Sequence, residues 1–105
     1  MDVVAREVVI EPGGSTGWHY HHMEISAIVK SGTLTRILHD HTVEVSTAGD
    51  FFVERAGAHH VHLGRNLGAV PVVLHLTYAQ PEDRPFAVPA PAPAQTSRRI
   101  SPRTR

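Results

Sequence analysis

Nine histidines stand among the 105 residues of this chain, and most of them lie in small groups. His19 and His21 are two positions apart, and so are His60 and His62. Because side chains alternate along a β-strand, each pair presents two imidazoles on one face of its segment. Two imidazoles from one strand and one or two from another suit iron, manganese, nickel, zinc or copper and leave positions open. The spacing therefore predicts a divalent metal site at these four histidines.

Strands must position these side chains. Short apolar segments separated by turn residues fill residues 1–80, and none shows sustained helical periodicity. We expect about eight strands, which favours an all-β jelly roll or barrel with the histidine pairs facing inward. The expected strands are residues 3–11, 16–22, 25–29, 33–38, 42–46, 51–54, 60–63 and 70–78.

The composition changes after residue 80. Six of the eight prolines follow that residue, as do five basic residues against two acidic ones. Proline- and alanine-rich sequence favours extended, unpaired backbone. We therefore expect a single β-barrel domain at residues 1–80 and a disordered or extended C-terminal tail at residues 81–105. Phe86 is a candidate to anchor this tail to the barrel or to a partner subunit.

Several classes of protein are excluded or disfavoured. The absence of cysteine excludes thiolate metal sites and cysteine nucleophiles, and the common phosphate-loop, nucleophile-elbow and dinucleotide motifs are missing. The formal net charge is zero and the first 80 residues are mildly acidic, so we expect no nucleic-acid partner. No segment approaches the roughly 18 to 20 apolar residues of a membrane span, and the first residues do not resemble a secretory signal. We expect no membrane association and a cytoplasmic location.

Two motifs resemble those of the cupin superfamily. Residues 12–21, PGGSTGWHYH, contain a glycine, five residues and then His-x-His, and the following segment closes at Gly32. Residues 48–60, followed by Asn66, are similar to the second motif. The resemblance covers about residues 12–80 and implies a small single-domain jelly-roll barrel that holds a divalent metal ion. It places His19 and His21 among the metal ligands.

The second motif leaves two candidates for its histidine. Counting forward from Gly49 and Gly57 gives His60, whereas counting back from Asn66 gives His62. A shift of two residues along a strand preserves the face, so both can point inward. On this resemblance either both histidines surround the ion with His19 and His21, or one of them is a ligand and the other is an orienting group or a general base.

The glutamate ligand that usually belongs to the first motif is displaced here. Its position holds Ile25, and Glu24 stands one residue earlier. Alternation would turn Glu24 outward unless a β-bulge intervenes. The resemblance therefore implies a centre made of histidines, as in three-histidine cupins. His39 and His41, on either side of a predicted turn, are expected to be solvated.

The resemblance implies a metal-dependent enzyme that acts on a small molecule. Neutral imidazoles leave the ion its positive charge, which favours a chelating or enolisable substrate such as a dicarbonyl compound. Dioxygenase chemistry is favoured over isomerase, cyclase or lyase chemistry, and no catalytic residue is assigned. The alternative is a non-catalytic binding module for a small metabolite or sugar. A homodimer is expected, because the core is small and sheet edges are open.

Overall fold

In the computed structural model of the chain, residues 2–81 and 83–94 are described. These residues form β-strands and one short 3₁₀ turn, as the all-β prediction requires. The elements are β1 (Asp2–Ile10), β2 (His19–Tyr20), β3 (Ile25–Ser31), β4 (Thr33–Ile37), β5 (Val43–Thr47), β6 (Phe51–Glu54), η1 (Ala58–His60), β7 (Leu63–Arg65), β8 (Val72–Gln80) and β9 (Val88–Pro89).

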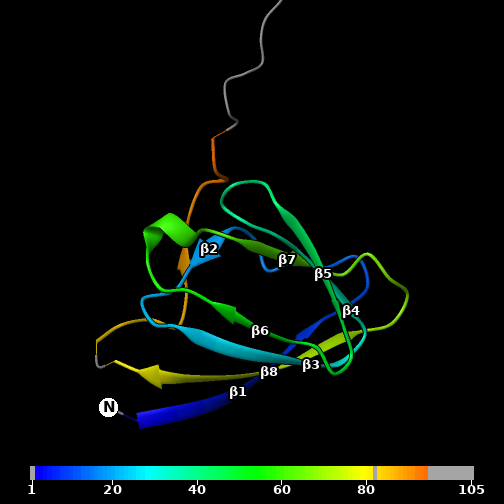
Figure 1. The fold of residues 1–105 in the computed structure, drawn as a ribbon, viewed down its shortest axis with the longest axis horizontal. Coiled ribbons are helices and arrows are strands. Elements are labelled where there is room, and N and C mark those ends of the chain that lie inside the picture. Colours follow the sequence, from blue (N-terminus) through cyan, green and yellow to red (C-terminus); the bar gives the residue numbers. More distant parts are fainter. Residues whose placement is uncertain (1, 82, 95–105) are drawn as a thin grey trace, which may run out of the picture.

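The strands pair in three antiparallel sheets. The largest has the order β1-β8-β3-β6, a second has the order β5-β4-β7, and β2 pairs with β9. Figure 1 shows the largest sheet along the lower side, β2, β7 and β5 above it, and β4 at the right. This arrangement confirms the predicted cupin-like jelly-roll barrel.

The core forms from strands whose apolar side chains alternate with polar ones. On β3, the side chains of Ile25, Ala27 and Val29 are fully buried, and every second residue of β8 from Val72 to Tyr78 packs against them. Burying a large aliphatic side chain stabilises the fold by roughly 1.5 to 3 kcal/mol. On β4 the same alternation buries Arg36, so a charged side chain faces the interior of the barrel. A buried arginine requires acidic partners, which the site described below provides.

Gly32 connects β3 in the large sheet to β4 in the second sheet. Its φ is 81°, and a Cβ at this position would lie 2.5 Å from the carbonyl oxygen of Pro71. Because of the positive φ and the close approach to the Pro71 backbone, any residue other than glycine would be strained at this position. Glycine here allows the chain to change sheets close to the start of β8.

The C-terminal segment is in contact with the barrel beyond residue 80. Strand β9 pairs with β2, and the amide of Ala90 donates to the carbonyl of Trp18 at 3.1 Å. Phe86 packs against the core, which is the barrel anchor that its sequence context suggested. The remainder of the expected tail, residues 95–105, lies outside the described residues. Within the part of the chain that is described, no helix has the length and apolar character needed to cross a membrane.

Candidate metal centre

Three histidines from two distant segments come together inside the barrel. His19 lies on β2, His21 follows this strand, and His62 precedes β7. The backbones of His19 and His62 pair directly, with amide-to-carbonyl distances of 3.0 and 2.9 Å. One ring nitrogen from each of the three side chains lies within 4.8 Å of the others. This group, the histidine cluster, contains three of the four predicted ligands.

His60 does not belong to the histidine cluster. The expected strand at residues 60–63 is wrong in its bounds, because residues 58–60 form η1 and β7 begins only at Leu63. The change from 3₁₀ to extended backbone at Val61 breaks the alternation that would have placed both histidines on one face. The ring of His60 instead packs edge-on against His39, with centroids 5.3 Å apart.

A backbone carbonyl fixes each ring of the histidine cluster. The Nδ1 atoms of His19, His21 and His62 lie 2.9, 2.8 and 2.8 Å from the carbonyl oxygens of Gly17, Phe86 and His60 respectively. A carbonyl can only accept a hydrogen bond, so each Nδ1 carries the proton and donates it. In the neutral ring Nε2 then keeps its lone pair. Carbonyl acceptors of this kind orient metal-binding histidines in proteins.

The cluster fits a divalent metal ion by its chemistry. Three neutral imidazole nitrogens are a donor set that zinc, iron, manganese, nickel and copper accept. Nε2 of His62 is buried and faces a carboxylate oxygen of Glu54 at 3.2 Å. When the ring is protonated the two groups form an ion pair, and a bound cation would take the place of that proton beside the carboxylate.

Glu54, which the sequence analysis missed, adds a carboxylate to the histidine cluster. Its carboxylate oxygens lie 3.3 Å from Nε2 of His21 and 3.2 Å from Nε2 of His62. In the β3–β6 register Glu54 is the direct partner of Ile25, the position where the first cupin motif usually carries glutamate. Cross-strand partners project from the same face of a sheet, so the neighbouring strand supplies the carboxylate. Glu24 is exposed and takes no part.

The charges of this group are strongly coupled. Burial on its own would raise the pKa of the Glu54 carboxyl, but the contacts with His21 and His62 hold that pKa far below its ordinary value. Burial would lower the pKa of His62, but the Glu54 carboxylate raises it instead. For His19, burial dominates and lowers the pKa. Glu54 is therefore ionised, and His19 favours the neutral form that binds metal.

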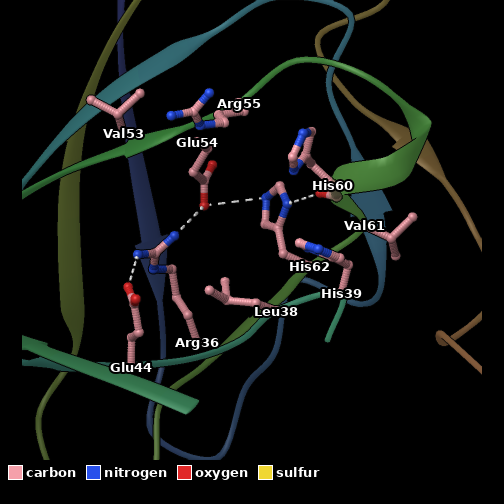
Figure 2. Close-up of a pocket in the computed structure, with 10 residues that line it drawn as sticks. All are labelled: Arg36, Leu38, His39, Glu44, Val53, Glu54, Arg55, His60, Val61 and His62. Atoms are coloured by element: carbon pink, nitrogen blue, oxygen red, sulfur yellow. Dashed lines mark hydrogen bonds and ion pairs between the residues drawn. The ribbon is translucent and has the colours of Figure 1, made fainter. Parts of the chain in front are cut away.

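Arg36 links Glu54 to a second carboxylate. Its guanidinium donates to Glu44 at 2.7 Å, lies 3.5 Å from Glu54 and covers the ring of Phe52 at 3.7 Å. Figure 2 shows this chain of contacts continuing from Glu54 to His62. Arg36 therefore holds the Glu54 side chain in place and compensates part of its charge.

Cavities border the cluster on several sides, and one of about 310 Å³ lies beside His19 and Phe86. The inner cavity, of about 60 Å³, is lined by His19, His21, His62 and by apolar side chains that include Phe86. The outer cavity, of about 230 Å³, opens on the other side, and its lining includes His39, His60 and Arg55. Arg36, Glu54 and His62 line both cavities and so form the wall between them. The inner cavity has the volume of about two water molecules, so of the two cavities that Glu54 and His62 line, the outer one has room for an organic molecule.

Comparisons with known proteins agree with this architecture. The family model for the cupin domain matches residues 6–78. A search of the curated proteins finds no significant match.

Solved structures with the same fold include proteins of several kinds. A conserved protein with a double-stranded β-helix domain from Klebsiella pneumoniae is 26% identical, with a TM-score of 0.71, and the match covers 86% of this chain and 76% of that one. The polyketide cyclase RemF from Streptomyces resistomycificus is 23% identical (TM-score 0.68; 81% and 58% covered). The DMSP lyase DddQ from Ruegeria pomeroyi is 17% identical (TM-score 0.73; 89% and 45% covered). At these identities the two enzymes show a shared fold alone, and this chain spans about half of their length.

Proposed function

This chain belongs to the cupin family, and we propose that it is a metal-dependent enzyme for a small chelating or enolisable organic substrate. The observation that carries the proposal is the histidine cluster, in which one ring nitrogen from each of three histidines lies within 4.8 Å of the others and each Nδ1 is held by a carbonyl. A cyclase and a lyase are among the proteins that share this fold. One fold supports many reactions, so the site must identify the chemistry.

The residues of the chain have distinct roles in this proposal. A divalent ion held by His19, His21 and His62 would supply Lewis-acid chemistry, polarising a substrate oxygen and stabilising an enolate. Glu54 adds one negative charge beside the cluster, so the site prefers anionic substrates less strongly than histidines alone would. Its ionised carboxylate balances the charge of the ion or accepts a proton from the substrate.

The outer cavity is the proposed substrate site. A small molecule there would contact His60, His39 and Arg55 at the rim and would meet Glu54 and His62 at the inner wall. Burial and the neighbouring positive groups lower the pKa of His60, so its ring is neutral near pH 7 and able to accept a proton. The cavity volume of about 230 Å³ favours a substrate smaller than typical drug-sized ligands.

The reaction depends on the ion. With iron, oxygenation of a dicarbonyl compound is the first reaction to test, as the dioxygenase prediction states. With zinc, manganese, nickel or copper, isomerisation, cyclisation and lyase reactions come first.

The test is elemental analysis of untagged protein, followed by oxygen-uptake and substrate screens. We expect about one divalent metal ion per chain, and its loss in His21→Ala and His62→Ala. His75→Ala is the matched control, because His75 is an exposed histidine on β8 that pairs with Glu7 away from the cluster. Equal metal content in all of these variants would refute the proposal.

The small inner cavity favours one alternative, a non-catalytic binding module in which the cluster holds a metal ion or metabolite without turnover. Metal-loaded protein that binds candidate dicarbonyl compounds but converts none of them would support this alternative. Turnover that disappears in His62→Ala would exclude it.

A further inference from the structure

Residues 83–94, called here the C-terminal strap, follow the family match, which ends at residue 78. The strap nevertheless reaches the histidine cluster. The carbonyl oxygen of Phe86 lies 2.8 Å from Nδ1 of His21. We propose that Phe86 is a positioning residue of the metal centre, whose carbonyl sets the orientation of His21 and whose ring holds that carbonyl in place. This inference rests on the proposed metal site.

The acceptor for His21 differs in origin from the other two. His19 and His62 donate to carbonyls two residues away, so each is oriented by its own segment. His21 donates to a carbonyl 65 residues away in the sequence. The correct orientation of His21 therefore requires the strap to be in place.

Water cannot readily replace this acceptor. Only 1% of His21 is exposed, so without the strap carbonyl its Nδ1–H would be left unpaired in the interior or would move to Nε2. A proton on Nε2 removes the lone pair that a metal ion requires. The Phe86 carbonyl consequently decides which ring nitrogen of His21 faces the cluster as a ligand.

The ring of Phe86 holds the carbonyl in position. It packs against His21 at 4.9 Å and Tyr78 at 5.2 Å between centroids, and the guanidinium of Arg6 lies 4.0 Å above it. The ring also lines the inner cavity beside Leu76. These contacts join the strap to β1 and β8 beside the inner cavity.

Polar contacts fix the strap on both sides of Phe86. Before it, the side-chain amide of Gln80 donates to the carbonyl of Arg84 at 2.8 Å. After it, β9 pairs with β2, and Ala90 donates to Trp18 at 3.1 Å. These contacts anchor the chain on either side of Phe86, and the ring of Phe86 fixes the carbonyl between them.

The experiment uses the full chain with Phe86→Ala and the conservative variant Phe86→Tyr. The first readout is the tautomer of His21 in metal-free protein, measured by ¹⁵N NMR of the imidazole nitrogens. The second readout is Zn²⁺ affinity from competition with a chromophoric chelator. In Phe86→Ala we expect the proton of His21 to shift from Nδ1 towards Nε2, which faces the Glu54 carboxylate at 3.3 Å, and Zn²⁺ affinity to fall about 10- to 100-fold. Phe86→Tyr should keep the wild-type His21 tautomer and the wild-type Zn²⁺ affinity.

Val29→Ala is the control for general destabilisation, because Val29 is fully buried and lines neither cavity. It should retain both the His21 tautomer and the Zn²⁺ affinity. If Phe86→Ala does not fold, Ala90→Pro removes the amide that binds Trp18 while leaving the core intact, and it should shift the same two readouts in the same direction.

The outcomes separate the two proposals. An unchanged His21 tautomer in folded Phe86→Ala, or in Ala90→Pro if the first variant does not fold, would overturn the role of Phe86. If the tautomer changes but the Zn²⁺ affinity does not, the proposed effect of Phe86 on metal binding is overturned. If wild-type protein binds no Zn²⁺, Fe²⁺ or Mn²⁺, the metal-dependent function fails, while the tautomer still reports whether Phe86 orients His21.

Discussion

Two histidines that look equivalent in the second motif have different roles in the structure. His62 contributes a ring nitrogen to the cluster, whereas His60 contributes its carbonyl to the Nδ1 of His62 and its ring to the outer cavity. The 3₁₀ turn at residues 58–60 produces this division, because it rotates His60 away from the inward face. A side chain and a backbone group of neighbouring residues thus serve one site.

The first prediction separates these roles. We expect His62→Ala to weaken Zn²⁺ binding by more than about 100-fold, which exceeds the effect of losing an orienting group, because a ligand itself is removed. His60→Ala should change Zn²⁺ affinity less than about threefold, since the backbone carbonyl remains. Chelator competition measures both. Equal losses in the two variants would contradict this assignment.

The second prediction concerns the ion pair of Glu54 and His62 in metal-free protein. The pKa of Glu54 is lowered from 4.5, so its contribution to stability is complete above pH 4.5 and is lost as the pH falls through its folded-state pKa. The pKa of His62 is raised from 6.5, so its contribution is complete below pH 6.5 and is lost as the pH rises through its folded-state pKa. The pair therefore stabilises the fold fully only between these values.

Urea unfolding at several pH values measures this effect. Glu54→Gln should remove the pair's contribution at pH 5.5 and flatten the profile on both sides. The loss should stay below the roughly 3 to 5 kcal/mol of a fully uncompensated buried charge, because Arg36 keeps its contact with Glu44. A profile with the same shape in wild type and variant would contradict the prediction.

Strand pairing and turns decide which side chains the elements can bring together. The β3–β6 register places Glu54 opposite Ile25, so a carboxylate reaches the cluster from β6 although β3 carries none on its inner face. The turn at Gly32 carries the chain from the large sheet to β4, the strand on which Arg36 faces inward. Both features support the polar wall between the two cavities.

The third prediction compares two glycines with similar backbone. Gly32 and Gly49 have φ values of 81° and 94°, but a Cβ at Gly32 would lie 2.5 Å from the Pro71 oxygen, whereas nothing lies within 4 Å at Gly49. Gly49→Ala should cost about 1 to 3 kcal/mol from strain at positive φ alone. Gly32→Ala should cost more, because backbone must also move. Equal unfolding free energies for the two variants would show that the clash does not matter.

The whole molecule is small, and ligand binding should contribute visibly to its stability. An ion that binds only the folded chain at 100 times its dissociation constant adds about 2.7 kcal/mol. For a domain of this size we expect the midpoint of thermal unfolding to rise by about 10 to 20 °C. His21→Ala should show no such rise with the same ion, and scanning calorimetry measures both. A comparable rise in this variant would place the ion elsewhere.

The homodimer remains a prediction for the whole molecule. Strands β5 and β6 are edge strands and expose apolar side chains, among them Val45 at 61% and Phe51 at 62%. Sedimentation at micromolar concentration should give twice the chain mass of 11.5 kDa, and Phe51→Lys should shift the protein towards monomer, because charge on an edge opposes pairing. A wild-type species of 11.5 kDa would contradict it.

Much of this protein could be predicted from its residues in order. The alternation of apolar side chains indicates strands, and the spacing of His19 and His21 places two imidazoles on one face. These properties depend on the local geometry of the chain, since side-chain direction along a strand repeats every two residues. The all-β barrel is confirmed for this reason, and His19, His21 and His62 lie together inside it, whereas His60 does not.

The tertiary structure decided the rest of the site. The choice between His60 and His62 depends on a 3₁₀ turn, the presence of Glu54 depends on pairing between β3 and β6, and the orientation of His21 depends on Phe86, 65 residues away. The one local signal for Glu54 was its charge at a position two residues after Phe52, on the same face of the strand. Contacts between distant segments follow from register and chain closure, which local periodicity does not specify.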